Sequence, residues 1–459
     1  MKTNTQKLAR PALGISFFAL FIALLALNGL GGLWPRGQHS LMSDLPRVAA
    51  APLPSDAAAQ QGAIRFLLAR TRRDPDDFRA QNMLAGRYLQ NLHDTSDHKF
   101  LPLAMNAAYA SLRSVGAEAN AGGLTVLIQA EQGGHNFAAA RDHALRLTQL
   151  LPTKSGSYAL LGDALLELGD YEGAARAFAR MEKFGGGSGA QTRLARLDLL
   201  RGDPQKAAAR LSNALSLALD APVPQREPVA WCRWQLGEVA FSVGDLQSAE
   251  NFYNDALITY PDYFRARAGL VRVFAARGDW DGALAQFNKS LLVTPDTAFL
   301  ATLGDIYHLA GREREARAVY ELVEVSASAA KATTPLARLH ARLHTRQLAL
   351  FYADHDLHAP EAFGLAKRDY SVRRDIYGAD TLAWTAFKAG HLPEAQSAMR
   401  AALQLNTQDA RLFYHAGMIE QALGQRDMAA KHLKHALDLN PQFDPLQAPL
   451  ARRALDKLL

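Results

Sequence analysis

The chain has 459 residues, of which 49% are hydrophobic and 21% charged, so it is a folded protein longer than one ordinary domain. Its formal net charge of +6 is spread out without a long run of Lys or Arg, which excludes a nucleic-acid-binding tail. The single cysteine, Cys232, excludes an internal disulfide and a multi-thiolate zinc site.

Residues 1–34 have the layout of a signal peptide or a signal-anchor helix. Basic residues up to Arg10 precede an uncharged stretch whose most apolar part is Ile15–Leu27. That part is too short to span a bilayer, but residues 12–34 give a helix of about 35 Å, which is long enough. Since no good cleavage site follows, we predict a retained single-pass transmembrane anchor, with a cleaved signal as the alternative.

The basic flank of this segment predicts that the rest of the chain crosses the membrane. With an Ala- and Arg-rich composition, this predicts a bacterial inner-membrane protein whose folded part lies in the periplasm. If the signal is cleaved, the product is a soluble periplasmic protein. Residues 35–60 are rich in Pro, Ala and Ser without periodicity and are predicted to be a linker.

A sequence pattern returns about every 34 residues after this linker. One copy reads "LLGDALLELGDYEGAARAFARM" (160–181) and another "GLVRVFAARGDWDGALAQFNKSLLVTP" (269–295). Each copy holds a glycine and, five residues later, an alanine. The glycines are Gly169, Gly202, Gly244, Gly278, Gly311, Gly390 and Gly424. The alanine series also includes Ala140 and Ala362, which brings the count to nine units over residues 121–443.

This period and residue pattern resemble the tetratricopeptide repeat family. The resemblance implies an all-α fold, an α-solenoid in which antiparallel helix pairs stack into a right-handed superhelix. In the unit around "WQLGEVAFSVGDLQSAENFYNDALITYP", Gly237 and Ala249 then let the two helices approach closely, and Gly244 makes the turn. Residues 61–120 are predicted to be degenerate N-terminal helical repeats, and residues 444–459 a C-terminal capping helix.

Catalytic motifs are lacking: the sequence has no GxxxxGK[ST], GxSxG or HExxH, and no cofactor is expected. We therefore predict a non-enzymatic protein. Histidines at helical spacing leave one alternative, a small-ligand or metal-binding protein. The pairs are His340 with His344, His355 with His358, and His432 with His435.

The resemblance also implies where a partner binds, because the first helices of such units line a concave groove. Aromatic and arginine side chains are favoured at binding surfaces. The predicted groove residues are Arg196, Trp231, Trp234, Phe241, Arg265, Arg272, Trp384, Lys388, Arg411 and Tyr414, with Glu238, Asp305 and His308 beside them.

The leading prediction for function is a scaffold that binds a protein or peptide in this groove within a bacterial envelope assembly. It contacts the membrane through its N-terminal helix and does not bind nucleic acid. An accessory role in polysaccharide export or cytochrome maturation is the narrower alternative.

Overall fold

The computed structural model describes residues 42, 45, 48–55, 57–95, 97–289, 297–328, 339 and 342–459. Met1–Asp44 form one unit and Leu45–Leu459 another, and the folded array is the second. The described residues are helical without any strand. The helices are α2 (Ala57–Arg73), α3 (Phe78–Thr95), α4 (Phe100–Ser114), α5 (Ala121–Gly133), α6 (Phe137–Leu150), α7 (Ser155–Glu167), α8 (Tyr171–Lys183), α9 (Gly187–Leu200), α10 (Pro204–Leu219), α11 (Arg226–Ser242), α12 (Leu246–Thr259), α13 (Phe264–Ala276), α14 (Trp280–Asn288), α15 (Thr297–Leu309), α16 (Glu313–Ser328), α18 (Thr345–Asp354), α19 (Ala359–Val372), α20 (Ile376–Lys388), α21 (Leu392–Ala402), α22 (Ala410–Ala422), α23 (Arg426–Leu439) and α24 (Gln447–Leu458).

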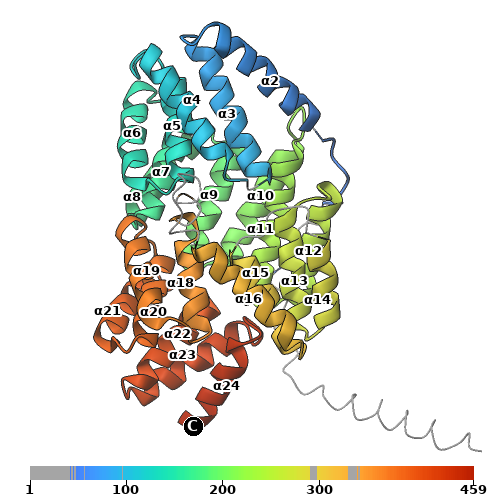
Figure 1. The fold of residues 1–459 in the computed structure, drawn as a ribbon, viewed down its shortest axis with the longest axis vertical. Coiled ribbons are helices and arrows are strands. Elements are labelled where there is room, and N and C mark those ends of the chain that lie inside the picture. The colour runs from blue at the N-terminus through green and yellow to red at the C-terminus, as the bar shows by residue number, and fades with distance from the viewer. Residues whose placement is uncertain are drawn as a thin grey trace, which may run out of the picture. The chain divides into compact units, whose positions relative to one another are not determined.

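From α5 to α23 the described helices form antiparallel pairs, as predicted (Figure 1). The turn inside each pair combines a glycine with an N-cap for the second helix. All seven predicted turn glycines have φ between +72° and +81°, the left-handed region in which a side chain is disfavoured. In four pairs the next residue caps the second helix, and its carboxylate accepts a backbone N–H three residues on. These caps are Asp170, Asp203, Asp245 and Asp279.

Small residues lie where the two helices of a unit cross, which confirms the reason predicted for them. A Cβ placed on Gly237 of α11 would overlap the ring of Tyr253 on α12. Gly162 and Gly304 meet second-helix rings in the same way. Ala249 is fully buried on the other side of the crossing. In these three pairs the ring fills the space that the absent side chain leaves, so a bulky residue on one helix faces a glycine on the other.

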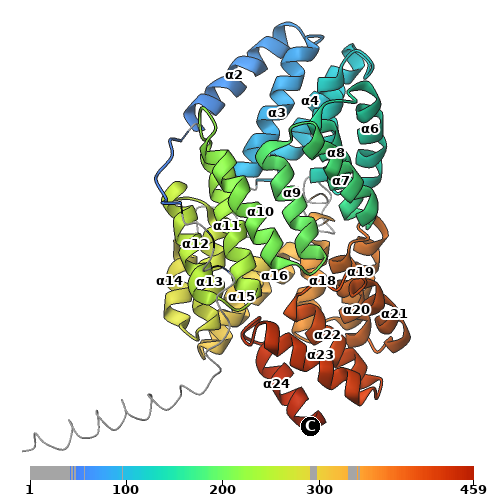
Figure 2. The same cartoon turned by 180° about the vertical axis from the view of Figure 1, so that it is seen from behind.

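The solenoid completes a turn and then packs against itself. The orange and red helices α18–α24 lie under the teal and green helices of the first turn in both views (Figures 1 and 2). Three described contacts of the same kind join the turns, each between a turn glycine and the loop that follows a later helix pair. They bring Gly169 to Arg374, Gly202 to Asn406, and Gly244 to the end of α23. We name this line of contacts the seam.

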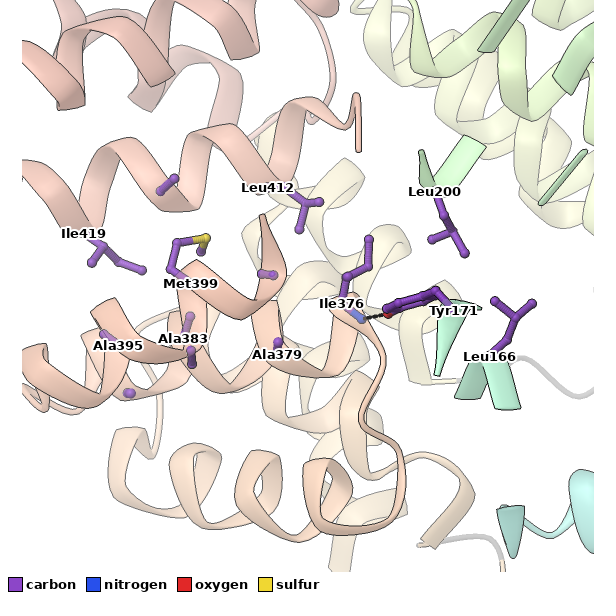
Figure 3. Close-up of a cluster of buried hydrophobic side chains, with 14 of the residues drawn as sticks. Leu166, Tyr171, Leu200, Ile376, Ala379, Ala383, Ala395, Met399, Leu412 and Ile419 are labelled. Carbon is purple, nitrogen blue, oxygen red and sulfur yellow. Dashed lines mark hydrogen bonds between the residues drawn. The ribbon is translucent and has the colours of Figure 1, made fainter. Parts of the chain in front are cut away.

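Backbone groups carry much of the seam. The Ile376 amide donates to the phenol oxygen of Tyr171 at 2.7 Å, 205 residues away in sequence (Figure 3). The Thr407 hydroxyl donates to the carbonyl of Leu200 at 2.5 Å. The Asn440 side-chain amide donates to the carbonyl of Phe241 at 2.7 Å.

A hydrophobic cluster runs through the seam. It contains Leu166, Tyr171 and Leu200 from the first turn, together with Ile376 and Leu412 from the second (Figure 3). The two turns therefore share one core, and burial of this apolar surface favours their association.

A charged cluster at the seam involves a predicted groove residue. Arg196 donates to Glu167 at 2.6 Å, and Arg373 of the second turn binds the other oxygen of the same carboxylate. Although burial opposes ionisation, the two guanidinium groups lower the pKa of Glu167 to about 2. Arg373 thus joins the two superhelical turns through Glu167, while Arg196 binds the same carboxylate from within the first turn.

Part of the predicted linker lies along the repeats. The carbonyl of Ala49 accepts a hydrogen bond from Nη2 of Arg233 at 3.1 Å, and the Leu53 amide donates to the carbonyl of Thr259 at 3.2 Å. Arg233 is only 1% exposed, so residues 48–53 help to satisfy a buried guanidinium on α11.

The predicted N-terminal anchor, residues 1–34, lies outside the described residues. Among the helices that the structure describes, none has both the length and the hydropathy needed to cross a membrane.

Candidate functional site

Two neighbouring first helices carry parallel rows of side chains. Trp231, Trp234 and Glu238 recur at spacings of three and four residues on one face of α11. The two indole rings meet edge to face with centroids 6.2 Å apart. On α13, the guanidinium of Arg265 lies 5.2 Å from the ring centroid of Trp234, and Arg272 forms an ion pair with Glu238. The structure therefore brings these predicted groove residues together.

The two rows lead into a cavity of about 530 Å³. Its wall includes Glu238 and Phe241 from α11, Arg272 from α13, Asp305 from α15 and Arg411 from α22. These five residues were all placed in the groove from sequence. The loops at 407–409 and 440–445 complete the wall, and both belong to the second superhelical turn. The cavity thus depends on the seam, because one turn alone supplies only part of the wall.

The arginines of this wall are matched by carboxylates. Arg272 binds Glu238, whose Oε1 also accepts a 2.7 Å hydrogen bond from Tyr253. Arg411 donates to Asp444 at 2.7 Å. A third wall arginine, Arg346, donates to Asp369 at 2.8 Å and to Asp375 at 3.1 Å. Since each guanidinium already has an anionic partner, none of the three offers an unbalanced positive charge to a ligand.

Two aromatic residues predicted for the groove are core residues instead. Trp384 and Tyr414 are each about 1% exposed. The indole of Trp384 stacks on His415 with centroids 4.1 Å apart and donates its N–H to Asp354 at 2.8 Å. These partners come from the neighbouring first helices α18 and α22, so the ring is enclosed between them. The groove prediction is wrong for these two side chains.

The remaining predicted residues also have partners within the chain. Lys388 binds Asp356 at 2.6 Å, and neither Lys388 nor Arg196 is part of the cavity wall. His308 pairs with Glu313 at 2.8 Å on an accessible surface. Arg196 and His308 keep about half of their side-chain surface exposed, so their place in a groove stays a prediction.

The histidine pairs do not converge on common groups. His355 lies 2.8 Å from Asp305, whereas the nearest carboxylate to His358 belongs to Glu324 at 3.4 Å. His432 binds Glu420 at 2.7 Å. His435 instead lies 3.0 Å from the amide oxygen of Gln408.

The first pair is only partly described. His340 lies outside the described residues, and the ring of its partner His344 meets that of His98. Among the residues that the structure describes, no group of three His, Cys, Asp or Glu side chains could hold a metal ion.

Sequence reasoning missed several cavity residues. Tyr377, Asp380 and Asp409 all belong to the wall. The alanine series did contain a signal for Tyr377, which lies 18 residues before Ala395. Two predicted groove residues have the same spacing to the alanine of their own unit: Arg411 to Ala429, and Trp231 to Ala249. Asp409 precedes α22 in a loop, where the helical period says nothing about which way a side chain faces.

Comparison with known proteins agrees with the repeat pattern. Four family models, all described as tetratricopeptide repeat, match residues 125–188, 188–260, 240–303 and 410–443. A search of the curated proteins finds no match.

Among solved structures, the chain is similar to PilW, described as a widely conserved type IV pilus biogenesis factor. The identity is 17% and the TM-score 0.37, over 47% of this chain and 95% of that one. It is similar to yeast Tom70 at 12% identity and a TM-score of 0.37, over 87% and 93%. It is also similar to MamA at 22% identity and a TM-score of 0.31, over 39% of this chain and 96% of that one.

The matched segments coincide with the helix pairs, the left-handed turn glycines and the small residues at the helix crossings. The chain therefore belongs to the tetratricopeptide repeat family.

Proposed function

We propose that the chain is a non-enzymatic scaffold whose inner face binds a segment of a partner protein. The observation that carries the proposal is the continuity of this face. The row of Trp231, Trp234 and Arg265 leads along α11 and α13 into the 530 Å³ cavity. Aromatic rings beside an arginine, next to a recess, form the kind of surface on which binding free energy concentrates.

The aromatic end of this face is the part best suited to first contact. The guanidinium of Arg265 contacts the rings of Trp234 and Phe264, at 5.2 and 5.5 Å, whereas the arginines of the cavity wall bind carboxylates. Its charge is therefore available to a ligand. Both tryptophans remain partly accessible, so their rings can bury further area on binding.

A pull-down tests this proposal. Wild type is compared with Trp231→Ala/Arg265→Ala and with a matched control, Tyr109→Ala/Arg113→Ala. The control removes an exposed aromatic ring and an exposed arginine from α4.

We expect crosslinking in the producing cells to capture a partner with wild type and with the control, and to lose it with the inner-face variant. Thermal melts should show that all three proteins are folded. If the inner-face variant captures the same proteins as wild type, the inner face is not the binding surface.

We further propose that this scaffold is exported and tethered to a bacterial inner membrane, with the array in the periplasm as part of an envelope assembly. The support is the basic-then-apolar layout of residues 1–34. Mass spectrometry of the chain from producing cells distinguishes a retained anchor from a cleaved signal. Recovery from the cytosolic fraction with an intact N-terminus would rule out export.

A further inference from the structure

One corner of the cavity wall has unbalanced charge. Asp380 on α20 and Asp409 at the start of α22 both belong to the wall. Neither forms an ion pair with Lys or Arg among the described residues, in contrast to Glu238 and Asp444. The corner therefore differs from the rest of the wall, where each guanidinium is matched by a carboxylate.

Each of these carboxylates is hydrogen-bonded within the fold. Oδ1 of Asp380 lies 2.8 Å from Nδ1 of His415. Oδ1 of Asp409 accepts the backbone N–H of Arg411 at 2.9 Å and so caps α22. The Asp409 carboxylate also accepts from the backbone of Leu412. The Oδ2 atom of Asp380 has no hydrogen-bond partner in the described part of the chain. Burial raises the pKa of Asp409, and the negative charge of Asp380 raises it further, whereas the backbone N–H groups and guanidinium of the following residues Arg411 and Leu412 lower it.

Tyr377 completes the corner, one helical turn before Asp380 on the same face of α20. Its side chain is 38% exposed, yet burial raises its pKa well above 10, and Asp409 adds to the shift. Its hydroxyl has no hydrogen-bond partner among the described residues, although it lines this cavity.

Two carboxylate oxygens beside an aromatic ring match a cation that has both charge and donors. An ammonium or guanidinium group can donate to both carboxylates, because each oxygen has two lone pairs, and can contact the ring face. A cavity of about 530 Å³ is within the usual size range for ligand pockets, so it has room for a long side chain.

We propose that Tyr377, Asp380 and Asp409 bind the cationic end of a lysine or arginine side chain of the partner segment. This rests on the proposed function and adds the chemistry of the bound residue. A partner side chain suits the site better than a free amine, because Glu238 and Arg272 of the cavity wall lie on the same helices as Trp231 and Arg265, where the rest of an extended segment can lie.

The variants are chosen to remove charge and keep the hydrogen bonds. In Asp380→Asn the amide oxygen can still face His415. In Asp409→Asn it can still cap α22, since asparagine is a good N-cap. The matched control is Asp427→Asn, which removes one charge from the exposed face of α23. Tyr377→Leu, which removes the ring and no charge, provides a second route if either Asn variant fails to fold.

The experiment pans a random peptide library on the full chain and on each variant. We expect the wild-type and Asp427→Asn binders to be enriched in Lys or Arg at one position. Titration of a selected peptide should then show binding about 10- to 100-fold weaker for either Asn variant. For Tyr377→Leu the expected loss is about 2- to 30-fold.

The outcomes separate the two proposals. Binders without basic enrichment, or binders of equal affinity for wild type and both Asn variants, would overturn the cation site and leave the scaffold intact. If no peptide binds and the pull-down shows no inner-face partner, the proposed function fails as well. Spermidine serves as the free-amine probe: tight binding of spermidine that is lost in the Asn variants, with no peptide selected, would overturn the partner as the source of the cation.

Discussion

Adding one methyl group at Gly169 should measure the strength of the seam. This residue has φ of +79°, and a Cβ there would lie 2.5 Å from the carbonyl oxygen of Arg374 in the other superhelical turn. Gly390 is the matched control, because it has φ of +81° in the same kind of turn and no heavy atom within 4 Å of the added Cβ. Both alanine variants incur the same backbone cost, and only Gly169→Ala pushes against the seam.

The backbone cost is about 1–2 kcal/mol for each variant. At Gly169 the carbonyl must also move, which adds about 1–3 kcal/mol for overpacking and about 1 kcal/mol if the bond between the Ile376 amide and Tyr171 breaks. We therefore expect Gly169→Ala to lower the free energy of unfolding by about 2–4 kcal/mol more than Gly390→Ala.

Urea denaturation gives the difference between the two variants. Hydrogen exchange at the Ile376 amide reports on the seam itself and should accelerate only in Gly169→Ala. If both variants lose the same stability and the Ile376 amide exchanges at the wild-type rate in each, the two superhelical turns do not pack in solution as described.

Other predictions concern the helix crossings and the seam. Gly237→Ala should destabilise the protein by about 1–3 kcal/mol, because the new Cβ overlaps the ring of Tyr253. Gly86→Ala has no heavy atom within 4 Å of the new Cβ and should stabilise the protein by about 0.5–1 kcal/mol. Urea midpoints that moved in the same direction for both variants would contradict this. Glu167 has its pKa lowered from 4.5 to about 2, so its contribution is present above pH 4.5 and lost as the pH falls toward 2. Since one pKa unit corresponds to about 1.4 kcal/mol, Glu167→Gln should flatten the stability profile over this interval by about 3 kcal/mol, and a profile as steep as wild type would argue against the pairing. Thr407→Val removes a hydrogen bond across the seam and should cost about 1 kcal/mol in thermal or urea unfolding.

The helix pairs were predictable because their determinants are local. A glycine with positive φ, an Asp cap and an alanine at the crossing each require a particular residue type, so they recur at a fixed period. The same period brought Glu238, Phe241, Arg272, Asp305 and Arg411 to one cavity.

Trp384 shows why part of the site was not predictable. It lies 11 residues before Ala395, as Glu238 lies 11 before Ala249, so the two occupy the same position in their units. Glu238 lines the cavity, while Trp384 is enclosed by packing with Asp354 and neighbouring helices. Position in the unit decides which face a side chain is on, but the curvature of the array decides whether that face meets a cavity or another helix.

The seam left no signal in the residue pattern. Its contacts use the carbonyls of Arg374, Asn406 and Leu439, which any residue would provide. The glycines that meet them were already explained by their turns. Contacts of this kind depend on where a whole superhelical turn ends, and that follows from the small rotations summed over the units between the two partners.

An open array of repeats tolerates the gain or loss of a unit, because each unit touches only its neighbours. The seam removes that freedom. Inserting one helix pair between Gly244 and Arg374 would move every later contact by one position, so Tyr171 would no longer meet the Ile376 amide. The number of units between the partners is thus part of what the sequence must conserve for the cavity to close. It also makes unfolding more cooperative than in an open array, since losing one unit releases contacts about 200 residues away.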